Sequence, residues 1–393
     1  MPKLHPNIEL VEVIKDTLPE KIASSLSKGI TEKRILCDQF GAYYLIKKPD
    51  PLTIEDVFKG YLSNEELKKP SFDTMVHIFS IKLESAFLEV LIPRMVKKMF
   101  EGIIVVPENY LHVDKDKSIG VISKFINSFS EFLAKKEAVK AEPLFERKYL
   151  PKRAHLSLTS EEARILGQLY AVALVFNLWD LLNSKLLNSG YCVGSDAVKR
   201  AAIVDFGCAG ILSYKGRHAD TLALDDPDFS PAKKINYSFF GQNYRDHYRH
   251  GFALPFDRLV APLLPHTVIS DLFNMSDKDP ISRSMLEGFC EAITVAEKNM
   301  TQNPLLLEEE LIESYKAITL DSSLKADELK SHLNTDFYGK SGKNSHSLVT
   351  LLQQRLVSAK MLIYQFKAGI PATVVQEKIR DFYYYSQCWG NTK

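Results

Sequence analysis

The sequence predicts an α+β fold, in which short strands and long helices occupy separate stretches of the chain. Two β-rich runs joined by a turn lie near the N-terminus, at residues 34–47. A long apolar helix is expected at residues 159–176, and helix follows helix after about residue 255. These observations indicate a small β-sheet region followed by helical regions.

Composition and charge narrow the function class. The chain has 393 residues, of which 45% are hydrophobic and 25% charged, and this balance is typical of a soluble globular protein with two or three domains. A net charge of +1 argues against general nucleic-acid binding. The five cysteines are scattered without a Cys-x-x-Cys motif, which excludes an obvious zinc site. Their odd number argues against a disulfide framework and favours a reducing, cytosolic setting. No signal peptide and no apolar run of about 20 residues is present, so we expect a soluble or peripheral protein.

The β-rich residues 34–47 read as a hairpin with its turn at residues 39–41. The second strand ends in Leu45-Ile46-Lys47, and Lys48 follows. Since successive side chains of a strand point to opposite faces, only one of the two lysines can face the interior, and we assign Lys47 to that face. The alternative is that both lysines simply end a strand at the solvent edge.

The next expected element is a helix over residues 72–99, with apolar residues at helical spacing. It carries Glu84 and Glu89, which are five positions and therefore about 140° apart around the helix, so they cannot share one face. Glu84 lies closer to the middle of the apolar stripe. Glu84, rather than Glu89, is therefore the preferred candidate for a functional glutamate on this helix.

The long helix at residues 159–176 is preceded by a capping box of Thr159 and Glu162 and leads to several polar residues. They are Asp180, Asn183 and Asn188, and an apolar strand then ends at Asp205-Phe206-Gly207. In phosphoryl transfer one carboxylate orients the attacking hydroxyl, while an amide oxygen and a second carboxylate hold Mg²⁺ against nucleotide phosphates. Asp180 is suited to orient the attacking hydroxyl. Either asparagine could supply the amide oxygen for Mg²⁺, and Asp205 could supply the second carboxylate. Taken alone, Asp-Phe-Gly is also compatible with an ordinary strand-to-turn junction.

The order of helix, Asp, Asn, strand and Asp-Phe-Gly resembles the protein-kinase-like superfamily, and in particular its lipid-kinase and other atypical branches. Leu45-Ile46-Lys47 is similar to the Val-Ala-Ile-Lys of that superfamily. The resemblance implies a two-lobed fold, with a small antiparallel β-sheet lobe at residues 1–122 and a helical lobe at residues 123–255. A helical C-terminal extension for a partner or a lipid would follow at residues 256–393. ATP and Mg²⁺, or Mn²⁺ in its place, are the implied cofactors.

The same resemblance assigns roles to the candidate residues. Asp180 would be the catalytic base, Lys47 would contact the phosphates and be held by Glu84, and Asp205 would bind the metal. Most of the superfamily places the metal-binding Asn five residues after the catalytic Asp, where this chain has Lys185, so both asparagines stay open. No Gly-rich loop precedes Lys47, and Gly41 alone cannot cover phosphates. Either another element covers the nucleotide or the chain is a pseudokinase.

Basic residues gather before the long helix and after Asp-Phe-Gly, and they suggest a site for a polyanion. The resemblance extends to secreted effector kinases of intracellular bacteria such as Legionella, which implies activation by host inositol hexakisphosphate and anchoring to phosphatidylinositol 4-phosphate through the C-terminal region. The alternative functions are a lipid kinase, a pseudokinase that acts as a binding module, and an enzyme that transfers AMP. The alternative for the basic clusters is that they are solvated turns without a ligand. The candidate polyanion ligands are Arg147, Lys148, Lys152, Arg153, Lys215, Arg217 and His218.

Overall fold

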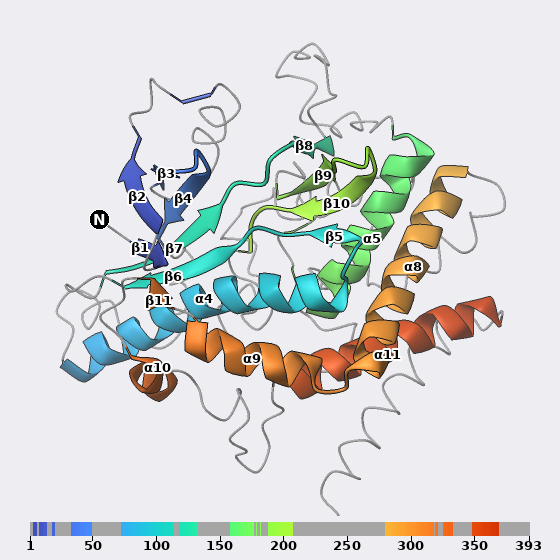
Figure 1. Cartoon of the computed structure of the whole chain (residues 1–393). Helices are drawn as coiled ribbons and strands as arrows, with labels where there is room; N and C mark the ends of the chain where they lie inside the picture. The colour runs from blue at the N-terminus through green and yellow to red at the C-terminus, as the bar shows by residue number, and fades with distance from the viewer. Residues whose placement is uncertain are drawn as a thin grey trace, which may run out of the picture.

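The computed structural model describes residues 3–5, 8–13, 18–19, 33–48, 72–113, 118–132, 158–176, 178, 181, 188–206, 280–317, 319–320, 325–332 and 348–368. In this part of the chain two β-sheets and a set of helices form a mixed α+β fold, in agreement with the predicted class (Figure 1). The candidate site lies where the larger sheet, the smaller sheet and one long helix meet.

The larger sheet is built mainly from antiparallel pairs, and one short strand from the C-terminal region adds to its edge in parallel. The predicted hairpin is confirmed as β3 and β4, paired from Cys37 opposite Tyr43 to Lys33 opposite Lys47. In sheet order the strands are β1 (Lys3–His5), β2 (Ile8–Glu12), β3 (Lys33–Asp38), β4 (Tyr43–Lys47), β7 (Ile119–Lys124), β6 (Asn109–Val113) and β11 (Thr319–Leu320).

Asp38 fixes the turn between β3 and β4. Its Oδ1 accepts hydrogen bonds from the backbone N–H groups of Phe40 and Ala42 at 2.9 and 2.8 Å, and Gly41 has a φ of 82°. Burial opposes ionisation of Asp38, but these bonds and the Tyr44 hydroxyl outweigh it and lower its pKa. The turn therefore forms because an aspartate and a glycine stand where an acceptor and a positive φ are needed.

Helix α4 (Phe72–Met99) has the bounds that the sequence predicts and packs against β6, β7 and β5. It runs along both sheets in Figure 1. From Leu83 to Pro93 every side chain of this helix is buried, because the sheets cover one side and the C-terminal helices the other. The helix also contains Pro93 in its interior, where proline removes a helical N–H.

The smaller sheet holds the strand that leads to Asp205. Its strand order is β5 (Ile104–Val105), β10 (Lys199–Ile203), β9 (Ser189–Val193) and β8 (Phe129–Glu131). Strands β9 and β10 form an antiparallel hairpin, with Ser189 opposite Ile203. The apolar strand predicted before Asp205 is thus β10.

Helix α5 (Ser160–Phe176) begins with the predicted capping box. The Thr159 N–H donates to Glu162 Oε2 at 3.0 Å, and the Glu162 N–H donates to Thr159 Oγ1 at 3.2 Å. Helix α8 (Pro280–Gln302) packs along it, and the two backbones meet at Gly167 and Gly288. A Cβ atom at either glycine would overlap with a backbone carbonyl oxygen of the facing helix.

Gly288→Ala is expected to destabilise the protein by roughly 1–3 kcal/mol, because the added methyl group forces two packed helices apart. The fall in melting temperature in a thermal unfolding experiment measures the effect. Glu287→Ala, at the preceding and exposed position of α8, is the control for an alanine placed in this helix without the close contact. A melting temperature of Gly288→Ala equal to that of the unmodified protein would contradict this close packing.

The C-terminal helices pack against α4 and α5. They are α9 (Leu306–Ala317), α10 (Ala326–His332) and α11 (Leu348–Lys367). The buried Arg355 of α11 donates from Nε and Nη2 to the Leu174 carbonyl oxygen of α5, at 3.2 and 3.0 Å. The Arg355 guanidinium therefore places a positive charge at the C-terminal end of α5, where it is favourable for the helix dipole. Helix α5 has no basic residue in its own last turn.

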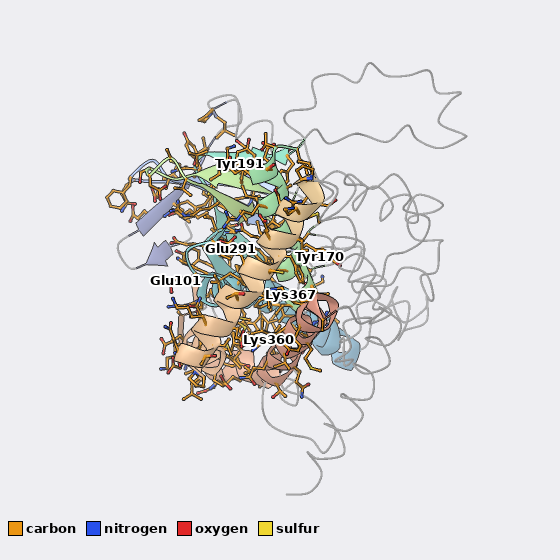
Figure 2. All side chains as sticks on the ribbon, turned by 90° about the vertical axis from the view of Figure 1, so that its right-hand side faces the viewer. Glu101, Tyr170, Tyr191, Glu291, Lys360 and Lys367 are labelled. Carbon is orange, nitrogen blue, oxygen red and sulfur yellow. The ribbon has the colours of Figure 1, made fainter. Side chains whose placement is uncertain are left out.

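Ion pairs between side chains at the surface connect α8 with α5 and with α11. Arg164 of α5 donates to both carboxylate oxygens of Glu291 on α8, at 2.9 and 2.7 Å, and Lys360 of α11 pairs with Glu297. Figure 2 shows Glu291 on α8 and Lys360 on α11. Residues 256–279 and 369–393 of the predicted helical C-terminal region lie outside the described residues, and the domain limits at 122 and 255 stay predictions. Among the helices described, none is both long and apolar enough to cross a bilayer.

Candidate functional site

Three charged side chains from distant parts of the sequence meet at the junction of the two sheets. Lys47 Nζ lies 2.6 Å from Asp205 Oδ1 and also forms an ion pair with Glu89. The side chains of Lys47 and Glu89 are only 8% and 5% exposed, whereas that of Asp205 is 40% exposed. The cluster is thus buried on the lysine side and open to solvent at the Asp205 carboxylate.

Each member of the cluster stands at a defined point of the fold. Lys47 is the last residue of β4, Glu89 lies in α4, and Asp205 follows β10 by two residues. Lys47 faces the interior and Lys48 is exposed, as strand alternation predicts. The β4–β7 pairing places Lys47 opposite Val121, in the middle of β7, so the lysine backbone is held by its neighbours on both sides.

Electrostatics keep the lysine charged. Burial alone would lower the pKa of Lys47, but the Asp205 and Glu89 carboxylates outweigh it and raise the pKa above its ordinary value. The stabilisation from this pairing is therefore fully present below the ordinary lysine pKa and is lost only as the pH rises through the raised one. At neutral pH the site holds one cation against two carboxylates.

The choice of Glu84 as the partner of Lys47 was wrong, because the ion pair is made by Glu89, five residues further along α4. Both glutamates are buried, so burial does not distinguish them. Glu84 instead lies near Tyr315 of α9, where burial, followed by the Glu84 charge, raises the pKa of the Tyr315 phenol to about 12.

Of the two candidate asparagines, Asn188 lies in the described part of the chain. It immediately precedes β9, and its backbone carbonyl oxygen accepts from the Val204 N–H at 3.1 Å. This bond places Asn188 across from the residue before Asp205. Asn183 and the predicted base Asp180 lie outside the described residues.

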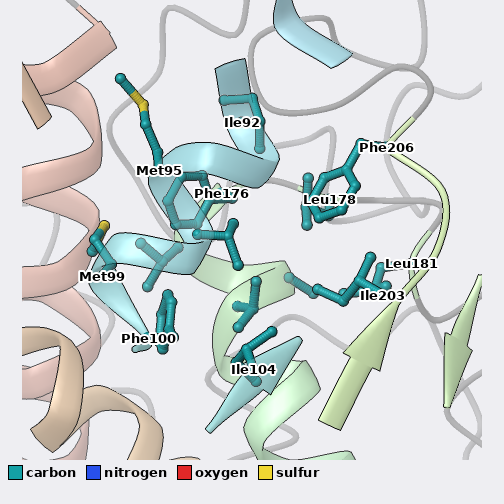
Figure 3. Packing of buried hydrophobic residues seen from close by; sticks show 14 of the residues in the cluster. Ile92, Met95, Met99, Phe100, Ile104, Phe176, Leu178, Leu181, Ile203 and Phe206 are labelled. Atoms are coloured by element: carbon teal, nitrogen blue, oxygen red, sulfur yellow. The ribbon is translucent and has the colours of Figure 1, made fainter. Parts of the chain in front are cut away.

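Phe206 anchors the segment that carries Asp205. It is 1% exposed and belongs to the main buried cluster together with Leu178, Leu181 and Ile203. Figure 3 shows Leu178 beside Phe206, and Leu181 beside Ile203. The Leu178 N–H donates to the Ala173 carbonyl oxygen at 3.0 Å, so the chain leaving α5 is tied to the helix end before it reaches Asp180.

Gly41 does not cover the charged cluster. The turn that contains it precedes Tyr43 at the start of β4, whereas Lys47 stands at the other end of that strand. Lys33, the first residue of β3, is opposite Lys47, so the connection between β2 and β3 reaches the sheet at the Lys47 end. Most of that connection, and all seven candidate polyanion ligands, lie outside the described residues.

The part of the chain that the structure describes has no group of three or more His, Cys, Asp or Glu side chains arranged to hold a metal ion. The chain matches no protein-family model, and a search of curated proteins finds no significant match. The function is therefore inferred from the geometry of the site itself.

Proposed function

We propose that this protein is an ATP- and magnesium-dependent phosphotransferase with a two-lobed, protein-kinase-like fold of the atypical type. The observation that carries the proposal is the meeting of Lys47 from a sheet strand, Glu89 from the helix packed on that sheet, and Asp205 from the Asp-Phe-Gly segment. Protein kinases need a strand lysine paired with a helix glutamate, and an Asp-Phe-Gly aspartate for the metal. Three residues separated by 42 and 116 positions thus meet in the combination that this chemistry requires.

The exposure of the three groups fits their proposed roles. Lys47, fixed by Glu89, would donate to nucleotide phosphates from a position where it stays protonated. Asp205 presents a partly exposed carboxylate, and Asn188 stands near it through the Val204 hydrogen bond. Mg²⁺ prefers oxygen ligands and is commonly bound by one or two protein carboxylates plus substrate phosphates, so these residues fit it. Once bound, the ion would neutralise charge on the transferring phosphoryl group.

The chain after α5 would supply the residue that accepts the proton of the attacking hydroxyl. Asp180 follows the buried Leu178 by two positions, and Leu178 is fixed to the end of α5. A carboxylate of this kind lowers the barrier by taking the proton as the new bond forms. Asn188 is the preferred metal ligand over Asn183, because its position beside Val204 brings it close to Asp205.

The wider proposal is that the chain is a bacterial effector acting on an unknown protein in host cells. In it, inositol hexakisphosphate is the activator and a lipid such as phosphatidylinositol 4-phosphate is the membrane anchor. The resemblance of the sequence supports this extension, and the basic clusters are its candidate ligands.

Incubation of the purified full chain with Mg²⁺ and ATP labelled at either the γ- or the α-phosphate tests the proposal. We expect γ-label to reach a protein acceptor in eukaryotic extract, and more of it when inositol hexakisphosphate is added. Transfer of α-label would identify AMP transfer, and label on added phosphoinositides would identify a lipid kinase. Binding of ATP with no transfer under any of these conditions would reveal a pseudokinase and overturn the proposal.

A further inference from the structure

Helix α4 lacks one of its own hydrogen bonds at the residue that pairs with Lys47. In an α-helix the carbonyl of residue i accepts from the N–H of residue i+4. For Glu89 that residue is Pro93, which has no N–H to donate. The Glu89 carbonyl is therefore available to a donor from outside the helix, and a buried carbonyl needs such a donor.

Asn109 of β6 supplies that donor. Its Nδ2 donates to the Glu89 carbonyl oxygen at 2.8 Å, and its Oδ1 accepts from the Ser123 hydroxyl at 2.6 Å. Asn109 and Ser123 are 5% and 6% exposed and stand opposite each other in the β6–β7 pairing. The amide thus links the helix to two adjacent strands through a buried chain of hydrogen bonds.

Glu89 is in consequence held at two points. Its side chain pairs with Lys47, and its main chain is bonded to Asn109. Strand β7 takes part in both contacts, because Ser123 supports Asn109 and Val121, two residues earlier, is opposite Lys47. Apolar side chains hold α4 against the sheet without fixing its rotation, whereas a hydrogen bond is directional.

We infer that Asn109 is a positioning residue, whose hydrogen bond to the carbonyl freed by Pro93 sets the rotation of α4 at which Glu89 reaches Lys47. For its effect on catalysis this inference rests on the proposed phosphotransferase function. The geometric part does not, since the Lys47–Glu89 pair exists in the protein whatever reaction it serves.

Asn109→Leu, which keeps the shape of the side chain and removes the donor, tests the inference in combination with Pro93→Ala. The alanine restores an N–H to α4, so the Glu89 carbonyl regains a partner within the helix. In the double variant we expect the melting temperature to recover toward that of the unmodified protein. Phosphate transfer at saturating ATP should stay reduced roughly five- to tenfold, because the link to the sheet is still missing.

A second measurement reads the ion pair without relying on activity. Labelling by an amine-reactive reagent, quantified by mass spectrometry, compares Lys47 with the exposed Lys48 in the same molecule. The Lys47:Lys48 ratio should rise in Asn109→Leu and stay raised in the double variant, because a displaced Glu89 leaves the lysine accessible. Tyr110→Phe, the next residue on β6, is the matched control and should alter neither the ratio nor the transfer rate.

Recovery of transfer rate and labelling ratio along with melting temperature in the double variant would show that Asn109 only satisfies a buried carbonyl, and would overturn the inference. An unchanged labelling ratio in Asn109→Leu would do the same. If the unmodified protein transfers no phosphate, the proposed function fails, while the labelling ratios still decide the role of Asn109.

Discussion

Asp205→Ala is expected to abolish magnesium-dependent phosphate transfer while the fold survives. The Asp205 side chain is 40% exposed, so its loss removes little packing, and Lys47 keeps Glu89 as a buried partner. In the proposed function this carboxylate is the main metal ligand, so its loss would remove much of the charge stabilisation of the transition state. We expect the initial rate with labelled ATP to fall by on the order of 10³-fold or more, because electrostatic stabilisation is commonly the largest catalytic contribution.

Asp196→Ala is the matched control for this substitution. Asp196 lies in the turn between β9 and β10, is exposed, and pairs with Arg200 through a hydrogen bond of 3.0 Å. An aspartate is thus lost from the same hairpin, but away from Lys47, and the transfer rate should not change. Transfer by Asp205→Ala at the rate of the unmodified protein would contradict the kinase proposal.

Local signals in the sequence were sufficient to predict the strands and the helix start that surround the candidate site. The β3–β4 hairpin, the Thr159 capping box and the apolar strand before Asp205 each depend on neighbouring residues, and each is present in the structure. Strand alternation predicted that only one of the two lysines faces the interior, and the similarity of Leu45-Ile46-Lys47 to Val-Ala-Ile-Lys selected Lys47. Whether these residues perform phosphoryl transfer stays a prediction.

The helix partner of Lys47 could not be predicted from the pattern of α4. The choice of Glu84 assumed an amphipathic helix with one apolar stripe, but α4 is buried from Leu83 to Pro93 on all sides. In a helix covered all round, the middle of the apolar stripe does not indicate which face meets a given strand. Pro93 was the one local signal, because it frees the carbonyl of Glu89 for a contact with the sheet.

The position of the C-terminal elements in the fold depends on long-range contacts, which local sequence patterns do not predict. Strand β11 pairs with β6 across about 200 residues, and Arg355 reaches the end of α5 from α11. Nothing in the sequence near Gly167 indicates that Gly288 will face it. Sequence patterns predict elements, while the pairing of distant elements follows from the packing of the whole core.

Lys47→Met should cause a large loss of both activity and stability. Methionine has a length similar to that of lysine but no charge, so Glu89 is left buried with no lysine beside it. In the proposed function the nucleotide phosphates would lose their cation as well. Removing one partner of a buried ion pair costs about 3–5 kcal/mol, and we expect the melting temperature to fall accordingly. Lys48→Met, at an exposed position of the same strand end, should leave both properties unchanged.

The pH dependence of the Lys47→Met variant identifies the origin of its instability. A carboxylate buried without a cation takes up a proton more readily than in the unfolded chain, so the destabilisation is absent below about pH 4, the ordinary range of glutamate, and grows as the pH rises. The melting temperatures of variant and unmodified protein should therefore converge in acid and diverge toward neutrality. Adding Glu89→Leu removes the buried charge, and at pH 7 the double variant should regain most of the lost stability but none of the phosphate transfer. A Lys47→Met variant whose instability is the same at pH 4 and pH 7 would show that the lysine stabilises the protein through packing and not through its charge interaction with Glu89.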